Sequence, residues 1–328
     1  MNSNTFLLRA NPKLILVMSR ALAALRPSLI AFLVANAQTL SGGTETPISF
    51  CNVLFVGNLC AAIAVVAFFG WSPIMGDLRQ LSPKILIGLL INGCLAALLS
   101  SLIYLGLEYT MVTNAVLLGR LGPIIYAVVG ALIWGKTILK SEWFGFSLIV
   151  LGILAIVLVG SNFQINRGDL LILGSTLVYA TTSTIGKFML SQDIPLRTVV
   201  FTRNFISAVV FFAIANIIFG FHHFSDAFSG QLWLVMAIYA VIIIVLAQIL
   251  WYSALGRLDS KVVGKWTSLS PIFGVIYAFV LNGERPANVQ FIAFAIIMTG
   301  IWITTLKQRS PSKDDMNDMA VGGESSAS

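Results

Sequence analysis

The sequence predicts an all-α membrane protein with ten transmembrane helices, arranged as two inverted five-helix repeats with both termini in the cytoplasm. Three observations predict this fold. The composition is strongly apolar, ten apolar runs are long enough to cross a bilayer, and a set of landmark residues recurs at an offset of 148 positions.

The composition excludes an ordinary soluble domain. Of the 328 residues, 58% are hydrophobic and 10% are charged, whereas soluble domains carry roughly 25% charged residues. In lipid, every backbone polar group needs a partner within the protein, so a helix or a closed barrel is required. The apolar runs are continuous and do not alternate in polarity, which favours helices over a barrel.

Ten runs reach the roughly 20 mostly apolar residues that a spanning helix needs. The first run is the weakest, because Arg26 and Pro27 interrupt it. The basic segment 1–21 is expected to be a cytoplasmic N-terminal segment, and 308–328 to be a disordered cytoplasmic tail. The ten expected helices are about 22–40, 50–70, 84–106, 111–133, 143–160, 168–190, 197–220, 231–254, 262–282 and 289–306.

The positive charges set the expected orientation, because lysine and arginine gather on the cytoplasmic side of membrane proteins. With the N-terminus inside, sixteen of the 20 lysines and arginines fall in inside segments, and two, Arg167 and Arg285, fall outside. A missed or additional helix would flip each later loop and remove this asymmetry. The net charge of +7 is spread over short loops and does not indicate nucleic-acid binding.

The landmark residues indicate an internal repeat. Its two halves are expected at 22–160 and 161–307, with five helices each. Because five is an odd number, the second half must enter the membrane upside down relative to the first. Inverted repeats are typical of transporters that alternate access to a central site. Matching pairs are Pro123 and Pro271, Gly135 and Gly283, and Gly152 and Gly300.

The fourth and ninth expected helices carry the most specific pattern. The segments 120–136, RLGPIIYAVVGALIWGK, and 268–285, SLSPIFGVIYAFVLNGER, each place a glycine and a charged residue twelve positions after a proline. This pattern resembles the drug/metabolite transporter superfamily, specifically its EamA-like ten-helix members. Gly135, Gly283 and Glu284 match the motif, whereas Lys136 departs from it. The resemblance implies import or export of small metabolites, often amino acids or related solutes.

Two prolines suggest where the halves could move. Pro123 and Pro271 lie inside expected helices, where a proline removes a backbone hydrogen bond and kinks the helix. Their matching positions predict helix hinges around one cavity. The alternative is a static kink that improves packing.

Arg120 is the most informative single residue. It lies about nine residues into its expected helix, or roughly 14 Å along at 1.5 Å per residue, near the bilayer midplane. A charge there is costly unless it faces water or a partner, so it indicates a functional site. The alternative is an internal ion pair or carbonyl contact between helices. A substrate-binding Arg120 suits an anionic or zwitterionic solute.

Other polar residues in the expected helices could line the same cavity. For each of them the alternative is helix packing or anchoring at the membrane interface. Arg203, Lys187 and Lys265 lie near cytoplasmic helix ends and are expected to extend to the interface. The further candidates for substrate binding are Asn36, Tyr104, Tyr179, Thr182, Gln248, Tyr252 and Trp266.

These features favour a secondary transporter that moves a small metabolite by alternating access. One alternative is a multidrug or cation exporter of the same fold, which needs a membrane-embedded carboxylate that the sequence lacks. The other is a membrane enzyme, which needs a buried catalytic constellation. No catalytic residue, metal site or cofactor is expected from the three cysteines and the pair His222 and His223.

The expected partners are a small-molecule substrate and the lipid bilayer, with no nucleic acid. A monomer or a homodimer fits a chain whose ten helices can enclose a cavity. The expected location is the plasma (inner) membrane, as a multi-pass protein, with an organelle membrane as the alternative.

Overall fold

A computed structural model describes residues 11–36, 39, 50–135, 137–159, 166–190, 192–220, 230–247, 250, 254, 258, 266 and 269–306. The regular structure within these residues is helical, which confirms the predicted all-α class. The elements are α2 (Pro12–Ala35), α4 (Phe50–Phe69), α5 (Trp71–Gln80), α6 (Pro83–Tyr109), α7 (Val112–Leu118), α8 (Leu121–Trp134), α9 (Lys140–Leu154) with η1 (Ala155–Val159), α10 (Arg167–Leu190), α11 (Leu196–Ile214) with η2 (Ala215–Phe219), α12 (Gly230–Tyr239) with η4 (Ala240–Leu246), α15 (Ser270–Asn282) and α16 (Asn288–Leu306).

Several of these helices are suited to a bilayer. Within the described part of the chain, six helices are long and apolar enough to cross a membrane, or seven if the bent pair α4 and α5 is one span. Two shorter apolar helices, Leu232–Ile243 and Ser270–Asn282, accompany them. The chain is therefore a helical protein with multiple apolar spans, and the total of ten remains a prediction.

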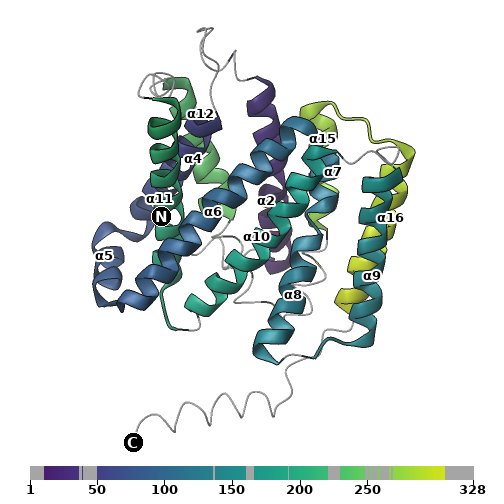
Figure 1. Cartoon of the computed structure of the whole chain (residues 1–328), viewed down its shortest axis with the longest axis horizontal. Coiled ribbons are helices and arrows are strands. Elements are labelled where there is room, and N and C mark those ends of the chain that lie inside the picture. The colour runs from purple at the N-terminus through teal and green to yellow at the C-terminus, as the bar shows by residue number, and fades with distance from the viewer. Residues whose placement is uncertain are drawn as a thin grey trace, which may run out of the picture.

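The helices pack as pairs of distant segments (Figure 1). Helix α9 packs along α16 at one edge of the bundle, and α4 packs along α11 at the opposite edge. Helices α6 and α10 pack together between these edges, and α2 packs against α15. Each of these pairs joins the first half of the chain to the second.

The contact between α9 and α16 fixes their relative direction. A Cβ atom added to Gly145 would lie 2.6 Å from the Gly300 carbonyl oxygen, and one added to Gly152 would lie 3.0 Å from the Ala293 carbonyl oxygen. Residue numbers along α16 therefore decrease as those along α9 increase, so the two helices are antiparallel. Small residues at these positions let the backbones approach closely.

Equivalent helix boundaries in the two halves have the same local geometry. Helix α8 ends at Gly135 with φ 65° and ψ 18°, and α15 ends at Gly283 with φ 65° and ψ 17°. This left-handed conformation favours glycine at a helix C-terminus. At the start of α9, the Glu142 side chain accepts a hydrogen bond from the Leu139 N–H at 2.7 Å. At the start of α16, Gln290 accepts one from the Ala287 N–H, also at 2.7 Å.

Three element boundaries differ from the sequence-based expectation. Helix α2 begins at Pro12 and not near residue 22, so part of the basic segment is helical. Gly70, with φ 87°, ends α4, and the chain bends by 100° into α5, for which no helix was expected. The fourth expected helix is present as the apolar span Val112–Ile133, but a turn at Gly119 and Arg120 divides it into α7 and α8.

Candidate functional site

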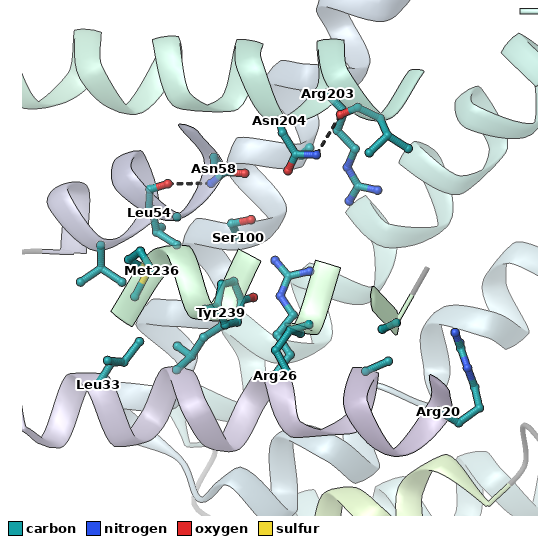
Figure 2. A pocket seen from close by; sticks show the side chains of 18 residues that line it. Arg20, Arg26, Leu33, Leu54, Asn58, Ser100, Arg203, Asn204, Met236 and Tyr239 are labelled. Carbon is teal, nitrogen blue, oxygen red and sulfur yellow. Dashed lines mark hydrogen bonds between the residues drawn. The ribbon is translucent and has the colours of Figure 1, made fainter. Parts of the chain in front are cut away.

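A cavity of about 290 Å³ lies between five of the helical segments. Its walls come from α2, α4, α6, α11 and the α12–η4 segment (Figure 2). The apolar part of the wall is built from Ala23, Ile30, Leu33, Val53, Leu54, Gly57, Ala96, Val200, Met236, Ile243 and Ala247. The polar part is built from Arg20, Arg26, Asn58, Ser100, Arg203, Asn204 and Tyr239.

Helical periodicity explains which residues line the cavity. On α2 the lining positions are spaced by three or four residues, which places them on one face of the helix. On α11 the same face carries Val200, Arg203 and Asn204, and on α4 it carries Leu54, Gly57 and Asn58. The polar residues therefore face the cavity because they share a helical stripe with its apolar wall.

Arg26 and Arg203 are the charged centre of this cavity. They extend from opposite walls, α2 and α11, toward the same space (Figure 2). Their guanidinium groups interact electrostatically. Among the described residues, no hydrogen bond or ion pair partner is found for either side chain, and no acidic residue is present in the described lining. The cavity is therefore electropositive.

The remaining polar residues of the wall are partly satisfied by the protein. Asn58 Nδ2 donates to the Leu54 carbonyl oxygen at 2.7 Å, and Asn204 Nδ2 donates to the Val200 carbonyl oxygen at 2.8 Å (Figure 2). In both residues, Oδ1 is the acceptor end of the side chain. Arg20 has a different setting, because its Nη2 donates to Ser19 Oγ at 3.1 Å.

None of the described residues predicted to bind substrate lines this cavity. Tyr104 is 3% exposed and packs within the main hydrophobic core. Thr182 is buried and donates to the Tyr179 carbonyl oxygen at 3.0 Å. Asn36 donates to the Phe32 carbonyl oxygen near the end of α2. Trp266 packs against a small apolar cluster, and the predicted residues Gln248 and Tyr252 lie outside the described residues.

Arg120 and Tyr179 lie outside the cavity lining, and Tyr179 interacts with both Arg120 and the cavity residue Arg203. Arg120 occupies the break between α7 and α8, where its Nε donates to the Val116 carbonyl oxygen at 3.3 Å. Tyr179 is 42% exposed and packs against Gly122 of α8. Both Arg120 and Arg203 interact electrostatically with Tyr179. The predicted midplane arginine therefore shares a neighbour with the cavity arginine, and its substrate contact stays a prediction.

Glu284, part of the predicted motif, caps a helix. One of its carboxylate oxygens accepts a hydrogen bond from the Val112 N–H. The other accepts from the Thr113 N–H at 2.8 Å and from Thr113 Oγ1 at 2.7 Å. These contacts tie the segment after Gly283 to the first turn of α7, the helix that precedes Arg120. A carboxylate suits this position because the first N–H groups of a helix have no intrahelical acceptor.

The two prolines lie at helix starts and not in helix middles. Pro123 is in the first turn of α8, directly after the break at Gly119 and Arg120. Pro271 is at the second position of α15. A proline fits the first turn because it lacks only an N–H that has no partner there. Hinge motion at these points stays a prediction.

Arg26 and Arg203 were not predicted to line a cavity. The expectation that Arg203 extends to the membrane interface was wrong, because its side chain lines the internal cavity. Arg26 was noted only as an interruption of the first helix and as an inside charge. One sequence signal could have found the site: Arg203 and Asn204 interrupt one apolar run, and Asn58 interrupts another.

Comparison with known proteins places this bundle in a transporter family. The model of the EamA-like transporter family matches residues 28–158 and 166–306. An uncharacterized transporter of Synechocystis sp. is 28% identical over 319 residues, covering 94% of this chain and 91% of the relative. An uncharacterized transporter of Archaeoglobus fulgidus is 26% identical over 272 residues, covering 78% of this chain and 88% of the relative.

A solved structure has a related fold. A protein described as "Crystal structure of protein" aligns with a TM-score of 0.55 and 19% identity. The alignment covers 88% of this chain and 97% of the other chain. At this identity the likeness concerns the fold alone.

Proposed function

The chain belongs to the EamA-like transporter family, and we propose that it is a secondary carrier that moves a small anionic or zwitterionic metabolite by alternating access. The substrate site in this proposal is the cavity between α2, α4, α6, α11 and α12–η4. One observation carries the proposal: an electropositive cavity lies inside a bundle of apolar helices. Arg203 is partly buried and Arg26 is exposed toward the cavity, and a charge on a membrane helix is retained where it faces water, a solute or an ion.

Alternating access is supported by the relation between the two halves. The helix caps at Gly135 and Gly283, and those at Glu142 and Gln290, recur at the offset of 148 residues. The antiparallel contact of α9 and α16 is what an inverted repeat requires of equivalent helices. We therefore propose two five-helix repeats, at 22–160 and 161–307, that exchange roles around the cavity.

The proposed topology has ten spans with both termini in the cytoplasm of a plasma (inner) membrane. The lysine and arginine asymmetry supports this orientation. Two of the ten spans would be the helix pairs α7–α8, with a turn at Gly119 and Arg120, and α12–η4, in which the π-helix continues directly from the α-helix.

The size and charge of the cavity argue against the multidrug alternative. Its volume of about 290 Å³ is just below the range for ligand pockets, which starts at about 300 Å³. A lipophilic cation would also meet Arg26 and Arg203, which repel positive charge. A small anionic metabolite fits both properties.

Transport through this cavity can be tested by filling it. Ala96, 4% exposed, lies in the cavity wall, whereas Ala67 is exposed on the outer face of α4. In proteoliposomes, flux of labelled organic acids and amino acids should be lost in Ala96→Phe and retained in the matched control Ala67→Phe. Wild-type flux in a correctly folded Ala96→Phe protein would show that solute takes another route.

A further inference from the structure

We propose that the cavity selects small organic solutes that carry two negative charges, held between Arg26 and Arg203. This inference rests on the proposed function and names the substrate class of the same site. It replaces the broader class, anionic or zwitterionic, with one that the geometry of the two arginines favours.

The two guanidinium groups are placed to bind one solute from both sides. Arg26 is on α2 and Arg203 is on α11, and both extend into the same cavity (Figure 2). Each guanidinium can donate two parallel hydrogen bonds to a carboxylate or to a phosphate. A short solute with an anionic group at each end can therefore engage both walls at once.

Charge balance distinguishes the classes of solute. Arg26 and Arg203 repel each other electrostatically, and the described lining contains no carboxylate that could compensate them. The third arginine of the lining, Arg20, donates to Ser19 Oγ and lies apart from this pair in Figure 2. A dianion neutralises both charges, whereas a monoanion leaves one uncompensated. A zwitterion also brings an ammonium group into the same space, so its net charge of zero leaves both arginine charges uncompensated. Since opposite charges attract and like charges repel, affinity should follow the number of negative charges on the solute.

Two kinds of solute share the required chemistry. A dicarboxylate places one carboxylate at each end, and a phosphate monoester places two charges on one group. The apolar part of the wall, which includes Leu54, Met236 and Ile243, suits a short carbon chain between or beside the anionic groups. Both kinds satisfy the proposal, and the experiment separates them.

The first test compares solutes of equal chain length on the full-length protein in detergent or nanodiscs. Succinate, butyrate and 4-aminobutyrate have four carbons each, with two, one and no net negative charges at pH 7. Glycerol 3-phosphate represents the phosphate monoesters. Succinate, glycerol 3-phosphate or both should raise the melting temperature and bind at least about tenfold more tightly than butyrate or 4-aminobutyrate.

The second test removes one positive charge at a time. Arg26→Gln and Arg203→Gln keep a polar side chain of similar length and should each weaken dianion binding by about tenfold or more. Arg203→Lys retains the charge and should recover part of the loss. Arg79→Gln is the matched control, because Arg79 is exposed on α5 and lies outside the cavity lining. The Arg79→Gln protein should bind dianions with the wild-type affinity.

Several results would overturn the proposal. Tighter binding of butyrate or 4-aminobutyrate than of either dianion would do so, as would the absence of binding by all dianions. Dianion binding unchanged in both arginine variants would place the site elsewhere. A failure of the proposed carrier function would be seen in a different experiment. In that case Ala96→Phe would transport solute at the wild-type rate, independently of which solute binds most tightly.

Discussion

Arg197 and Arg203 stand on the same helix, α11, and meet different surroundings. Arg197 Nε and Nη2 donate to the two carboxylate oxygens of Asp77 at 2.7 and 2.9 Å, and Thr198 Oγ1 donates to the same carboxylate at 2.6 Å. Arg203 lies fewer than two turns further along, in the wall of the cavity, where the described residues provide it with no carboxylate.

The difference distinguishes an arginine paired within the protein from one that faces the cavity. The Arg197–Asp77 pair joins α11 to α5 through two hydrogen bonds between the guanidinium and the carboxylate. Arg203 keeps its donors directed into the cavity and shares that space with a second positive charge. A protein gains no stability from such an arrangement, so we attribute it to the binding of an anion.

The largest expected effect comes from giving Arg203 the surroundings of Arg197. Asn58→Asp places a carboxylate in the cavity wall, so one of the two positive charges is compensated before any solute binds. Succinate affinity should fall by about tenfold or more, and butyrate should become the better ligand of the two. Isothermal titration measures both affinities.

The control for this change is Asn216→Asp. Asn216 also donates its Nδ2 to the carbonyl oxygen four residues earlier, at 2.8 Å, but lies outside the cavity lining. It should leave the succinate affinity unchanged. An Asn58→Asp protein that still prefers succinate by the wild-type ratio would contradict the charge-balance account.

A second structural charge, Glu284, should matter for stability and not for charge selectivity. Glu284→Ala removes the acceptor for the Val112 and Thr113 N–H groups, so the free energy of unfolding should fall by about 2 kcal/mol. Thermal unfolding in detergent measures this loss. The exposed neighbour Arg285→Ala should unfold like wild type, and an equal loss in both variants would argue against the cap.

In the two asparagines of the cavity, Nδ2 is bonded to the protein, and none of the described residues donates a hydrogen bond to Oδ1. A hydroxyl group on the solute can donate to such an oxygen, so malate should bind about fivefold more tightly than succinate. In Asn204→Leu the ratio of the two affinities should approach one. A ratio that stays at its wild-type value would show that Asn204 does not contact the hydroxyl group.

The smallest expected effect is that of the Arg197 pair itself. Partly exposed ion pairs contribute little to stability, and the Arg197 side chain is 34% exposed. Arg197→Gln should lower the melting temperature slightly, and Asp77→Asn should add nothing in the double variant. Succinate binding per folded molecule should remain intact. A loss of binding as large as in Arg203→Gln would remove the contrast between the two arginines.

The sequence predicted the helical class and the repeat because both depend on local patterns. Apolar runs of bilayer length and the glycines at 135 and 283 are visible without tertiary contacts, and the glycines adopt the same left-handed cap in the structure. The break between α7 and α8 was not predicted, because the run is apolar on both sides of Arg120.

The cavity was not predicted, because it depends on which face of each helix turns inward. From its place in the sequence alone, the Arg203 side chain could extend to the membrane interface or into the protein. The packing of α11 against α4 and α6 determines which of the two occurs. Arg26 was overlooked because the first helix was expected to start near residue 22. With α2 beginning at Pro12, Arg26 lies well inside the helix.

The most direct test of a dianion carrier is counterflow in proteoliposomes. Vesicles loaded with unlabelled succinate should take up labelled succinate through the wild-type protein and through Arg79→Gln. Uptake through Arg203→Gln should fall to the level of vesicles that contain no protein. Equal uptake by Arg203→Gln and wild type would contradict the account, because solute would then cross the membrane without the charge that the cavity presents.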